Sequence, residues 1–358
     1  MIEQRHKKVI IMAGGTGGHV FPALSVAEVL RSRNISVSWL GTRKGIESEL
    51  VPAQNFPIFY IDIGGLRGTK IFKWLTAPYV LIKAIFQALT IIRRESPDVI
   101  LGLGGFASGP GGVAAKILRL PLIIHEQNSI AGTTNKLLAK VATRILTAFP
   151  NSLPRGEWIG NPVREEISSL RPPLLGEIDA KRALRILILG GSLGALAINQ
   201  KVPLALASIE KNYRPEIRHQ SGKAHLKETQ QAYKDIDLKV SVEPFITDIA
   251  KAYEWADLVI CRSGALTISE LAAAGLGALL IPYPYAVDDH QFHNGEWLVS
   301  HGAADMVREE DLTSRLLASI LNEYLGDRKK LNSMAMNARK LARPKVAELV
   351  ADVCMESS

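Results

Sequence analysis

The chain has 358 residues, 47% hydrophobic and 22% charged, which is enough for two globular domains with separate cores. Its net charge of +8 favours an acidic partner, namely phosphorylated substrates or an anionic membrane. The sequence has no zinc-finger or RNP-type motif and no long basic run, so nucleic acid is disfavoured. Only Cys261 and Cys354 are cysteines, which excludes a disulfide framework or a four-cysteine metal site and favours a reducing compartment, the cytosol.

A glycine-rich loop follows the first predicted strand. Residues 8–13 predict a buried strand, and GGTGGH at 14–19 leads from it into a helix predicted at 22–33. Glycines let a backbone approach a ligand closely, and the N–H groups of a helix N-terminus attract anions. The loop lacks the G-x-G-x-x-G spacing, and no acidic residue follows the next predicted strand at 37–40, so nicotinamide binding is disfavoured.

The first half continues as alternating strands and helices. Strands are predicted at 57–61, 99–103 and 122–125 with helical patterns between them, which indicates a parallel α/β sheet. A second glycine loop, at 102–112, and the polar run HEQN, at 125–128, follow two of these strands on the edge where open α/β sheets bind ligands. Two such loops at one edge favour phosphate contacts, although each could be turn chemistry alone.

The pattern then restarts. GNPVR at 160–164 and the proline-containing stretch 168–181 predict a linker. After it, a strand at 185–189, the glycine loop GGSLGA and a helix at 196–210 repeat the arrangement of the N-terminus, which indicates two similar α/β halves. We therefore expect three parts: a first domain at 1–163, a second at 164–340, and a helical tail at 341–358 that packs back on the first.

The stretch 261–294 carries the most unusual polar chemistry. A strand at 256–261 and a turn lead into a helix at 265–274, whose N-terminus should attract a diphosphate while Glu270, in its second turn, accepts hydrogen bonds from sugar hydroxyls. A strand at 278–282 follows, and then a polar cluster at 288–294. The arrangement predicts a nucleotide-sugar pocket; an ordinary crossover helix with a surface carboxylate is the alternative.

The most apolar segment is 71–94. Lys83 and Gln87 interrupt it and Pro78 bends it, so a spanning helix is disfavoured. It could pack against the core, or it could lie in the interface of an anionic phospholipid membrane. In the second case the expected contacts are Phe72, Lys73, Trp74, Leu75, Tyr79 and Lys83.

Several motifs occur in an order that is typical of one family: GGTGGHVFPAL, GLRG, GGFASGPGG, HEQN, AGTTNK, GNPVR, GGSLGA, HQSGK and CRSGALTISELAAAG. Together they resemble the MurG family, the N-acetylglucosaminyltransferases that convert lipid I to lipid II in peptidoglycan synthesis. The resemblance implies a GT-B fold, with two Rossmann-like domains facing each other across a cleft. It also implies a peripheral enzyme on the cytoplasmic face of the plasma (inner) membrane, with a cell-wall synthesis complex as a candidate partner.

The resemblance also implies where the substrates bind. UDP-N-acetylglucosamine would contact Thr16, Gly17, Gly18, Asn128, Arg164, Ser192, Ile246, Ala265, Leu266, Thr267, Ile268, Ser269, Glu270 and Gln291, with the backbone of Ile246 meeting the uracil. Lipid I would bind at Gly14, Gly15, Gly104, Gly105, Ser108 and Gly109. Leu193 departs from the family, which usually has glutamine there, and this puts a side-chain contact from that position in doubt.

The family inverts the anomeric centre, so the reaction needs a base on one side of the sugar and stabilisation of the leaving diphosphate on the other. His19 is the candidate base because the positive end of a helix disfavours an imidazolium. Glu126 is the alternative base, and His19 could instead cap the helix or bind the acceptor diphosphate. No metal or other cofactor is expected; we interpret the D-x-D spacing at 235–237 as a solvated turn.

Two other functions remain open. A diacylglycerol glycosyltransferase would share the fold and the donor chemistry, and acceptor assays would distinguish it. A non-catalytic glycosyltransferase-like membrane adaptor would be expected to lack part of the donor pocket, whereas Glu270 and Gln291 are both present.

Overall fold

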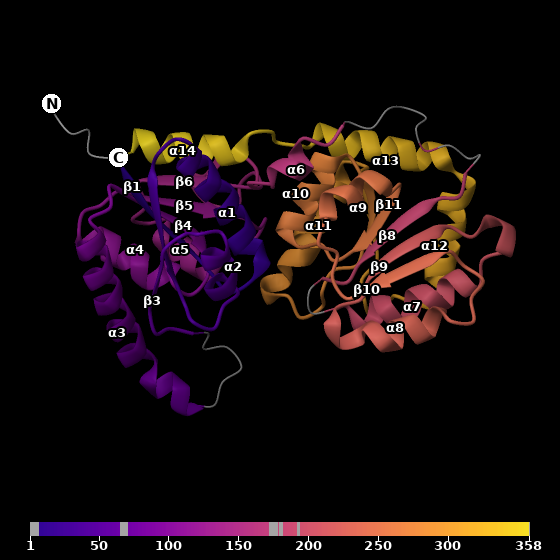
Figure 1. Cartoon of the computed structure of the whole chain (residues 1–358), viewed down its shortest axis with the longest axis horizontal. Helices are drawn as coiled ribbons and strands as arrows, with labels where there is room; N and C mark the ends of the chain where they lie inside the picture. The colour runs from indigo at the N-terminus through magenta and orange to yellow at the C-terminus, as the bar shows by residue number, and fades with distance from the viewer. Residues whose placement is uncertain (1–6, 65–70, 172–177, 179–181, 192–193, 358) are drawn as a thin grey trace. The chain divides into compact units, whose positions relative to one another are not determined.

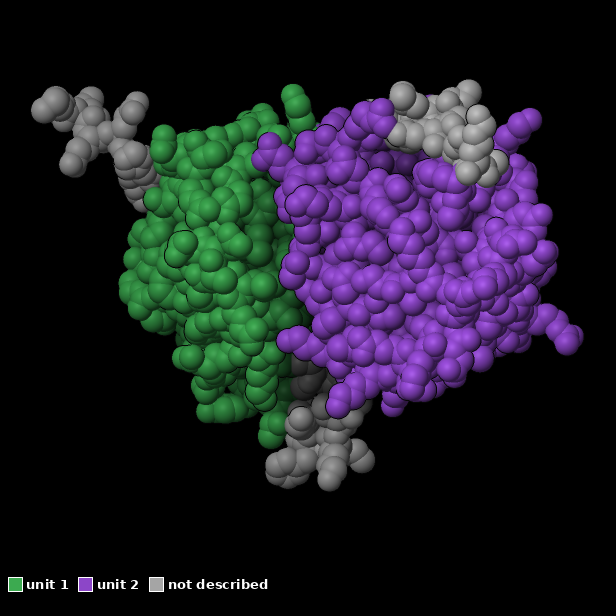
Figure 2. All heavy atoms as spheres, turned by 45° about the vertical axis from the view of Figure 1, so that its right-hand side comes forward, with its two compact units in different colours: residues 1–164, 345–358 green, residues 165–344 purple. Residues whose placement is uncertain are grey.

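The computed structural model describes residues 7–64, 71–171, 178, 182–191 and 194–357, with the backbone alone for 71–75. The chain forms two compact units, which Figure 2 distinguishes by colour. Unit 1 comprises Met1–Arg164 and Lys345–Ser358, and unit 2 comprises Glu165–Pro344. The chain therefore leaves unit 1 once and returns to it at its C-terminal end.

The described part of unit 1 contains a seven-stranded parallel sheet in the order β3-β2-β1-β4-β5-β6-β7. Ile11 in β1 pairs with Trp39 in β2 on one side and with Leu101 in β4 on the other. The strand order thus reverses between β1 and β4, the position at which open α/β sheets bind ligands. The strands are β1 (Lys8–Ala13), β2 (Ser36–Gly41), β3 (Ile58–Tyr60), β4 (Val99–Gly104), β5 (Leu122–Glu126), β6 (Arg144–Thr147) and β7 (Glu157–Trp158).

Helices cover both faces of this sheet (Figure 1). One core packs α1 and the returning α14 against the sheet through residues such as Leu30 and Val350. The other core packs α3, α4 and α5 through residues such as Ala88, Ala114 and Leu138. The helices are α1 (Gly17–Ser32), α2 (Glu47–Ala53), α3 (Ile71–Glu95), α4 (Ser108–Ile117), α5 (Thr133–Leu138) and α14 (Val346–Glu356).

Unit 2 repeats the architecture with a six-stranded parallel sheet in its described residues, in the order β10-β9-β8-β11-β12-β13. Its order reverses between β8 and β11. The strands are β8 (Arg185–Leu189), β9 (Glu216–Gln220), β10 (Val240–Glu243), β11 (Leu258–Cys261), β12 (Gly277–Leu280) and β13 (Ala304–Met306). The α-helices are α6 (Glu165–Ser168), α7 (Leu196–Ala207), α8 (Leu226–Tyr233), α9 (Ile249–Trp255), α10 (Ala265–Ala274), α11 (His290–Ser300), α12 (Ser314–Gly326) and α13 (Arg328–Lys340).

The predicted α/β class, with two parallel-sheet halves, is confirmed. Two boundaries differ in a way that affects the site. The helix α1 begins at Gly17, well before the predicted start at residue 22, and the loop predicted at 102–112 is confined to residues 105–107, between β4 and α4. Thr16 is extended and precedes the helix, and its carbonyl accepts a hydrogen bond from Val20 N at 3.3 Å. Because the glycines of this loop can adopt helical angles, His19 lies inside the first turn of α1.

Candidate active site

The two glycine loops of unit 1 pack backbone against backbone at the switch point. Gly105 has a φ of +86°, and a Cβ atom there would lie 2.4 Å from the carbonyl oxygen of Gly14. Any side chain at this position would therefore separate the loops. The sequence predicted both loops at one edge of the sheet, and the structure brings Gly14 and Gly105 into direct contact.

A buried carboxylate that the sequence pattern did not indicate holds the first loop. Glu47, in the first turn of α2, is 0% exposed. Its Oε2 accepts from Gly15 N at 2.9 Å, and its Oε1 accepts from Thr42 N and Thr42 Oγ1 at 2.9 and 2.7 Å. Glu47 thus connects the loop after β1 to the loop after β2. In the sequence it looks like any acidic residue at a helix start.

His19 lies between the ends of β4 and β5. Its Nδ1 is 2.9 Å from Oε1 of Gln127, the residue that follows β5 by one position. A Cβ on Gly104 would lie 2.8 Å from His19 Nδ1 and Cε1, so the imidazole packs against the bare backbone of β4. The half-buried ring is therefore held in one place beside both glycine loops.

Glu126, the alternative base, is 1% exposed and its two carboxylate oxygens are engaged. Oε1 accepts from Asn128 N at 2.9 Å, while Oε2 accepts from Gly132 N at 3.1 Å and from Asn135 Nδ2 at 2.9 Å. Such a carboxylate orders the loop after β5 and the start of α5. This geometry favours a structural role for Glu126 and leaves His19 as the candidate base.

Ser108 was expected to contact the acceptor, but its hydroxyl is buried. Ser108 Oγ donates to the carbonyl oxygen of Gly104 at 2.8 Å and lies 3.1 Å from that of Met12, and the residue is 0% exposed. The side chain therefore ties the start of α4 to β1 and β4. At the neighbouring Gly109, a Cβ would lie 3.7 Å from the methyl group of Thr134, an ordinary contact distance.

The remaining predicted donor residues of unit 1 surround the start of α1. Thr16 is exposed and its side chain makes no capping hydrogen bond to the helix. A Cβ on Gly17 would lie 2.9 Å from the ring of Phe21, whereas Gly18 has only Thr16 Oγ1 nearby, at 3.8 Å. Arg164 places its guanidinium over the same Phe21 ring at 5.3 Å. The helix start is thus flanked by a cation.

In unit 2, α10 begins directly after β11, at the switch point of the second sheet. Its N-cap residue, Gly264, has no side chain that could cap the helix, and the backbone N–H groups of a helix N-terminus can bind anions. Glu270 is only 5% exposed, and its Oε2 accepts from Tyr253 Oη at 3.0 Å. Burial, with the Glu270 carboxylate nearby, raises the pKa of the Cys261 thiol to about 12, so Cys261 stays neutral.

Other predicted donor contacts in unit 2 are already used in internal hydrogen bonds. Ile246 N donates to Gln220 Oε1 at 2.9 Å, so this N–H is engaged by the protein. Gln291, at the start of α11, accepts from Tyr283 N through Oε1 at 3.0 Å. Just before α11, Asp288 and Asp289 both have positive φ, at 54° and 50°, a conformation that costs energy for residues other than glycine.

The glycine loop of unit 2 follows β8. A Cβ on Gly190 would lie 2.9 Å from the carbonyl oxygen of Gln220, and one on Gly194 would lie 2.6 Å from that of Ser221, so the loop packs tightly on the end of β9. Asn199 supports this contact by donating to the Ser221 carbonyl at 2.9 Å. Ser192 and Leu193 lie outside the described residues.

Comparison with known proteins identifies the family of this chain. Residues 9–147 match the glycosyltransferase family 28 N-terminal domain, and residues 185–350 match the glycosyltransferase family 28 C-terminal domain. The chain belongs to glycosyltransferase family 28.

Close relatives of this family 28 chain extend over nearly its whole length. It is 51% identical to a protein of Cellvibrio japonicus (97% of this chain, 98% of the relative) and 49% identical to one of Alkalilimnicola ehrlichii (98% and 99%). Both are named UDP-N-acetylglucosamine–N-acetylmuramyl-(pentapeptide) pyrophosphoryl-undecaprenol N-acetylglucosamine transferase. A crystal structure of Acinetobacter baumannii MurG matches with a TM-score of 0.86 at 42% identity, covering 98% of this chain and 99% of that one. The resemblance to the MurG family is confirmed.

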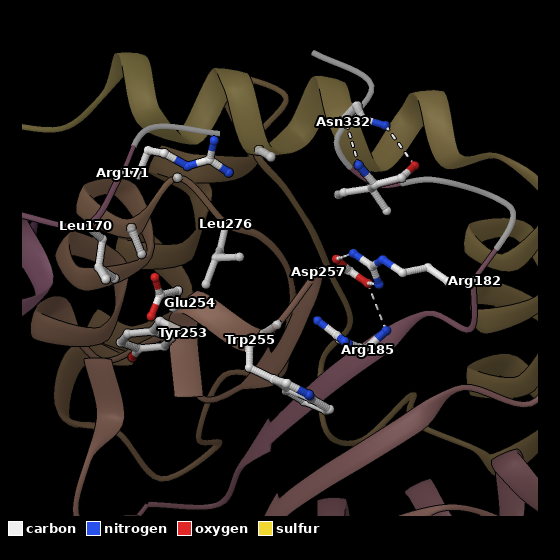
Figure 3. Close-up of a pocket in the computed structure, with 15 residues that line it drawn as sticks. Leu170, Arg171, Arg182, Arg185, Tyr253, Glu254, Trp255, Asp257, Leu276 and Asn332 are labelled. Atoms are coloured by element: carbon white, nitrogen blue, oxygen red, sulfur yellow. Dashed lines mark hydrogen bonds and ion pairs between the residues drawn. The ribbon is translucent and has the colours of Figure 1, made fainter. Parts of the chain in front are cut away.

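Figure 3 shows a cavity of about 190 Å³ in unit 2. It is lined by Arg185, the first residue of β8, and by Asp257, just before β11, so it lies at the amino ends of the strands. Arg182 closes one side with two hydrogen bonds of 2.6 Å to the Asp257 carboxylate. The predicted donor residues follow the carboxyl ends of the same strands, so this cavity is not the donor pocket.

Proposed function

We propose that the chain transfers N-acetylglucosamine from UDP-N-acetylglucosamine to lipid I, undecaprenyl-diphospho-N-acetylmuramoyl pentapeptide, with inversion, giving lipid II for peptidoglycan synthesis. The observation that carries the proposal is the identity of about one half, across nearly both chains, to relatives named for this reaction. The glycine loops and the start of α10, at the switch points of their own sheets, supply the phosphate-binding groups that it needs.

Each unit has a distinct role in this proposal. Unit 1 binds the acceptor through residues 14–15 and 104–109, and His19 takes the proton of the acceptor hydroxyl. Unit 2 holds the donor, with its diphosphate at the N-terminus of α10 and its ribose at Glu270. The acceptor oxygen bonds to the anomeric carbon, the bond from that carbon to the UDP oxygen breaks, and UDP leaves with the electron pair.

The D-x-D sequence at 235–237 has an ordinary surface environment. Asp237 is exposed and pairs with Lys211, which lowers the pKa of the carboxyl group. In the proposed mechanism the leaving diphosphate is instead stabilised by helix and loop N–H groups.

The direct test is the release of UDP from a panel of UDP-sugars, with and without acceptor. We expect release from UDP-N-acetylglucosamine that depends on a lipid I analogue and yields a disaccharide product. Diacylglycerol should not replace the analogue. Turnover with diacylglycerol alone would favour the alternative glycolipid synthase and contradict the proposal.

We also propose that unit 1 docks on the cytoplasmic face of the inner membrane, because the polyprenyl acceptor cannot leave the bilayer. Apolar side chains are exposed on three helices of one face of the sheet. The three helices pack in series, α3 on α4 and α4 on α5, and their exposed apolar side chains are here called the apolar face. Its members are Tyr79, Leu81, Ile82 and Phe86 on α3, Val113 and Ile117 on α4, and Leu137 and Val141 at α5.

The charges around the apolar face differ from those expected. Lys83 donates to Asp62 Oδ2 at 2.8 Å, and the ion pair raises the Lys83 pKa and lowers that of Asp62, so Lys83 is charged but paired with an acid of the protein. Other exposed cations lie on the neighbouring helices and turns: Lys116, Arg119, Lys136 and Lys140. These can attract anionic lipid, by about 1 kcal/mol each. The side chains of Phe72, Lys73, Trp74 and Leu75 lie outside the described residues.

Within the described residues, the helix segment Thr76–Glu95 is long and apolar enough to cross a membrane, judged by length and composition alone. Its other face, however, is part of a protein core: Ala84, Ala88 and Ile92 are at most 1% exposed. Insertion across a bilayer would remove these residues from unit 1. We therefore propose peripheral attachment, with α3 lying along the interface.

The double substitution Ile82→Glu/Phe86→Glu should abolish sedimentation with vesicles that contain phosphatidylglycerol, because it places two charges on the exposed side of α3. UDP binding should not change. Leu204→Glu is the matched control, because Leu204 is 60% exposed but belongs to α7 of unit 2. Vesicle binding that survives the double substitution and falls in the control would contradict the assignment of the apolar face.

A further inference from the structure

Two side chains at the end of β5, His125 and Gln127, form a hydrogen-bonded row that leads to His19 in α1. The Nε2 of His125 lies 2.8 Å from the carbonyl oxygen of Gly160, and its Nδ1 lies 3.2 Å from Nε2 of Gln127. Gln127 Oε1 then lies 2.9 Å from His19 Nδ1. His125 and Gln127 are 0% and 1% exposed, so the protein alone sets the orientation of this row.

The donors and acceptors of this row can be assigned in order, starting from the carbonyl oxygen of Gly160. A carbonyl oxygen only accepts, so His125 must donate to it from Nε2. Burial lowers the pKa of His125 to about 4, so the ring is neutral and carries no second proton. His125 Nδ1 is therefore an acceptor.

The amide of Gln127 can satisfy its surroundings in only one orientation. The atom that faces His125 lies 3.2 Å from the ring nitrogen Nδ1 and 3.2 Å from the backbone oxygen of His125, and both are acceptors. That atom must be the amide nitrogen. Consequently the amide oxygen faces His19, and His19 Nδ1 must carry the proton that it receives.

We infer that Gln127 is a positioning residue that holds neutral His19 with its proton on Nδ1 and its lone pair on Nε2. This inference rests on the proposed function in one respect, since Nε2 is then the atom that takes the proton of the acceptor hydroxyl. In the opposite tautomer, the Nδ1 lone pair would face the Gln127 oxygen, and Nε2 would already carry a proton.

The hydrogen bond between His19 Nδ1 and Gln127 Oε1 can also form when His19 is protonated. When the acceptor oxygen bonds to the anomeric carbon and UDP departs, the proton of the acceptor hydroxyl moves to His19 Nε2. The resulting imidazolium keeps its hydrogen bond from Nδ1–H to the Gln127 oxygen. An amide is neutral, so it orients the ring without a full countercharge. Gly104 completes the arrangement, because a Cβ there would lie 2.8 Å from the ring.

The tautomer can be measured without activity. We would record long-range nitrogen–proton correlation NMR spectra of the full chain with isotope-labelled histidine side chains, and assign the His19 signals with His19→Asn. Wild-type His19 should show a protonated Nδ1 and an unprotonated Nε2. Gln127→Leu should convert it to a mixture of tautomers or to the opposite one. A wild-type signal with the proton on Nε2 overturns the inference.

Gln127→Glu is a second test of the inference in case Gln127→Leu does not fold. A protonated glutamic acid can donate to His125 and accept from His19, and an ionised one can still accept from His19, so this variant should retain the Nδ1–H tautomer. Loss of that tautomer in Gln127→Glu, in protein with wild-type UDP affinity, would count against the inference.

Enzyme kinetics provide a second measurement of the role of Gln127. Gln127→Leu should lower kcat by about 10- to 100-fold, the range for losing a partner that orients a functional histidine, with KM for UDP-N-acetylglucosamine nearly unchanged. Gln54→Leu, an identical change at an exposed turn, should behave as wild type. If Gln127→Leu shifts the tautomer but leaves kcat unaltered, the positioning role is wrong. If the tautomer is as inferred but His19→Ala is active, it is the base assignment in the proposed function that fails.

Discussion

His19→Ala should lower turnover by about 10²–10⁴-fold, the usual contribution of a general base. The side chain lies in the first turn of α1, beside both glycine loops of unit 1, and its Nδ1 is hydrogen-bonded to Gln127. Donor binding should be nearly intact, because the proposed donor contacts near His19 are made by the backbone and neighbouring side chains. Steady-state kinetics with a lipid I analogue, together with calorimetry of UDP binding, measures both quantities.

His301→Ala provides the control for this experiment. His301 is exposed at the end of α11 and bonds to the carbonyl oxygen of Trp297, away from the proposed chemistry, so turnover should stay at the wild-type level. A small turnover loss in His19→Ala with a large rise in the acceptor KM would instead assign His19 to binding the acceptor diphosphate.

Glu270→Ala should weaken UDP binding by about 1.5–3 kcal/mol, the range for hydrogen bonds to a charged group. The carboxylate is buried in the second turn of α10, one turn beyond the proposed diphosphate position. Titration calorimetry with UDP is the measurement. An unchanged dissociation constant in a folded variant would rule out a ribose contact from Glu270.

Tyr253→Phe separates the two roles of this carboxylate. It removes the 3.0 Å hydrogen bond from Tyr253 Oη to the buried carboxylate but keeps Glu270 itself, so it should lower the free energy of unfolding by about 1.5–3 kcal/mol. UDP affinity should remain close to wild type. If Tyr253→Phe weakens UDP binding as much as Glu270→Ala, then Glu270 acts through local packing and not through the ribose.

Much of the fold was predictable because it depends on local patterns. Short apolar runs between glycine turns indicated the central strands β1, β4, β8 and β11, and the helix predicted at 265–274 agrees with α10 at both ends. Here Gly264 precedes the helix and Gly275 ends it in the left-handed conformation that glycine adopts readily. The strands β6, β7, β9 and β13 were not predicted. β6, β7 and β13 are short, and β9, with the sequence EIRHQ, has Ile217 as its single apolar residue and so lacks the pattern of a buried strand.

The site was predicted less completely than the fold. The glycine loops were recognisable because glycine has few roles other than turns and close backbone approach, and motif order indicated the MurG family. Glu47 and Gln127 gave no such signal. Glu47 looks like a solvated acid at a helix start, and Gln127 stands between two residues that were named as candidates.

The amino-acid sequence by itself thus determined the α/β class, the repeat of two halves, the glycine loops and the family. Only the tertiary structure decided which polar side chains hold the loops in place by hydrogen bonds and which could take part in the reaction. Glu47 bonds to Gly15, 32 residues earlier, and Gln127 bonds to His19 across 108 residues. The sequence around a carboxylate or amide looks the same whether the side chain is exposed or buried. Its hydrogen-bond partners depend on how strands that are distant in the sequence pack at one edge of the sheet.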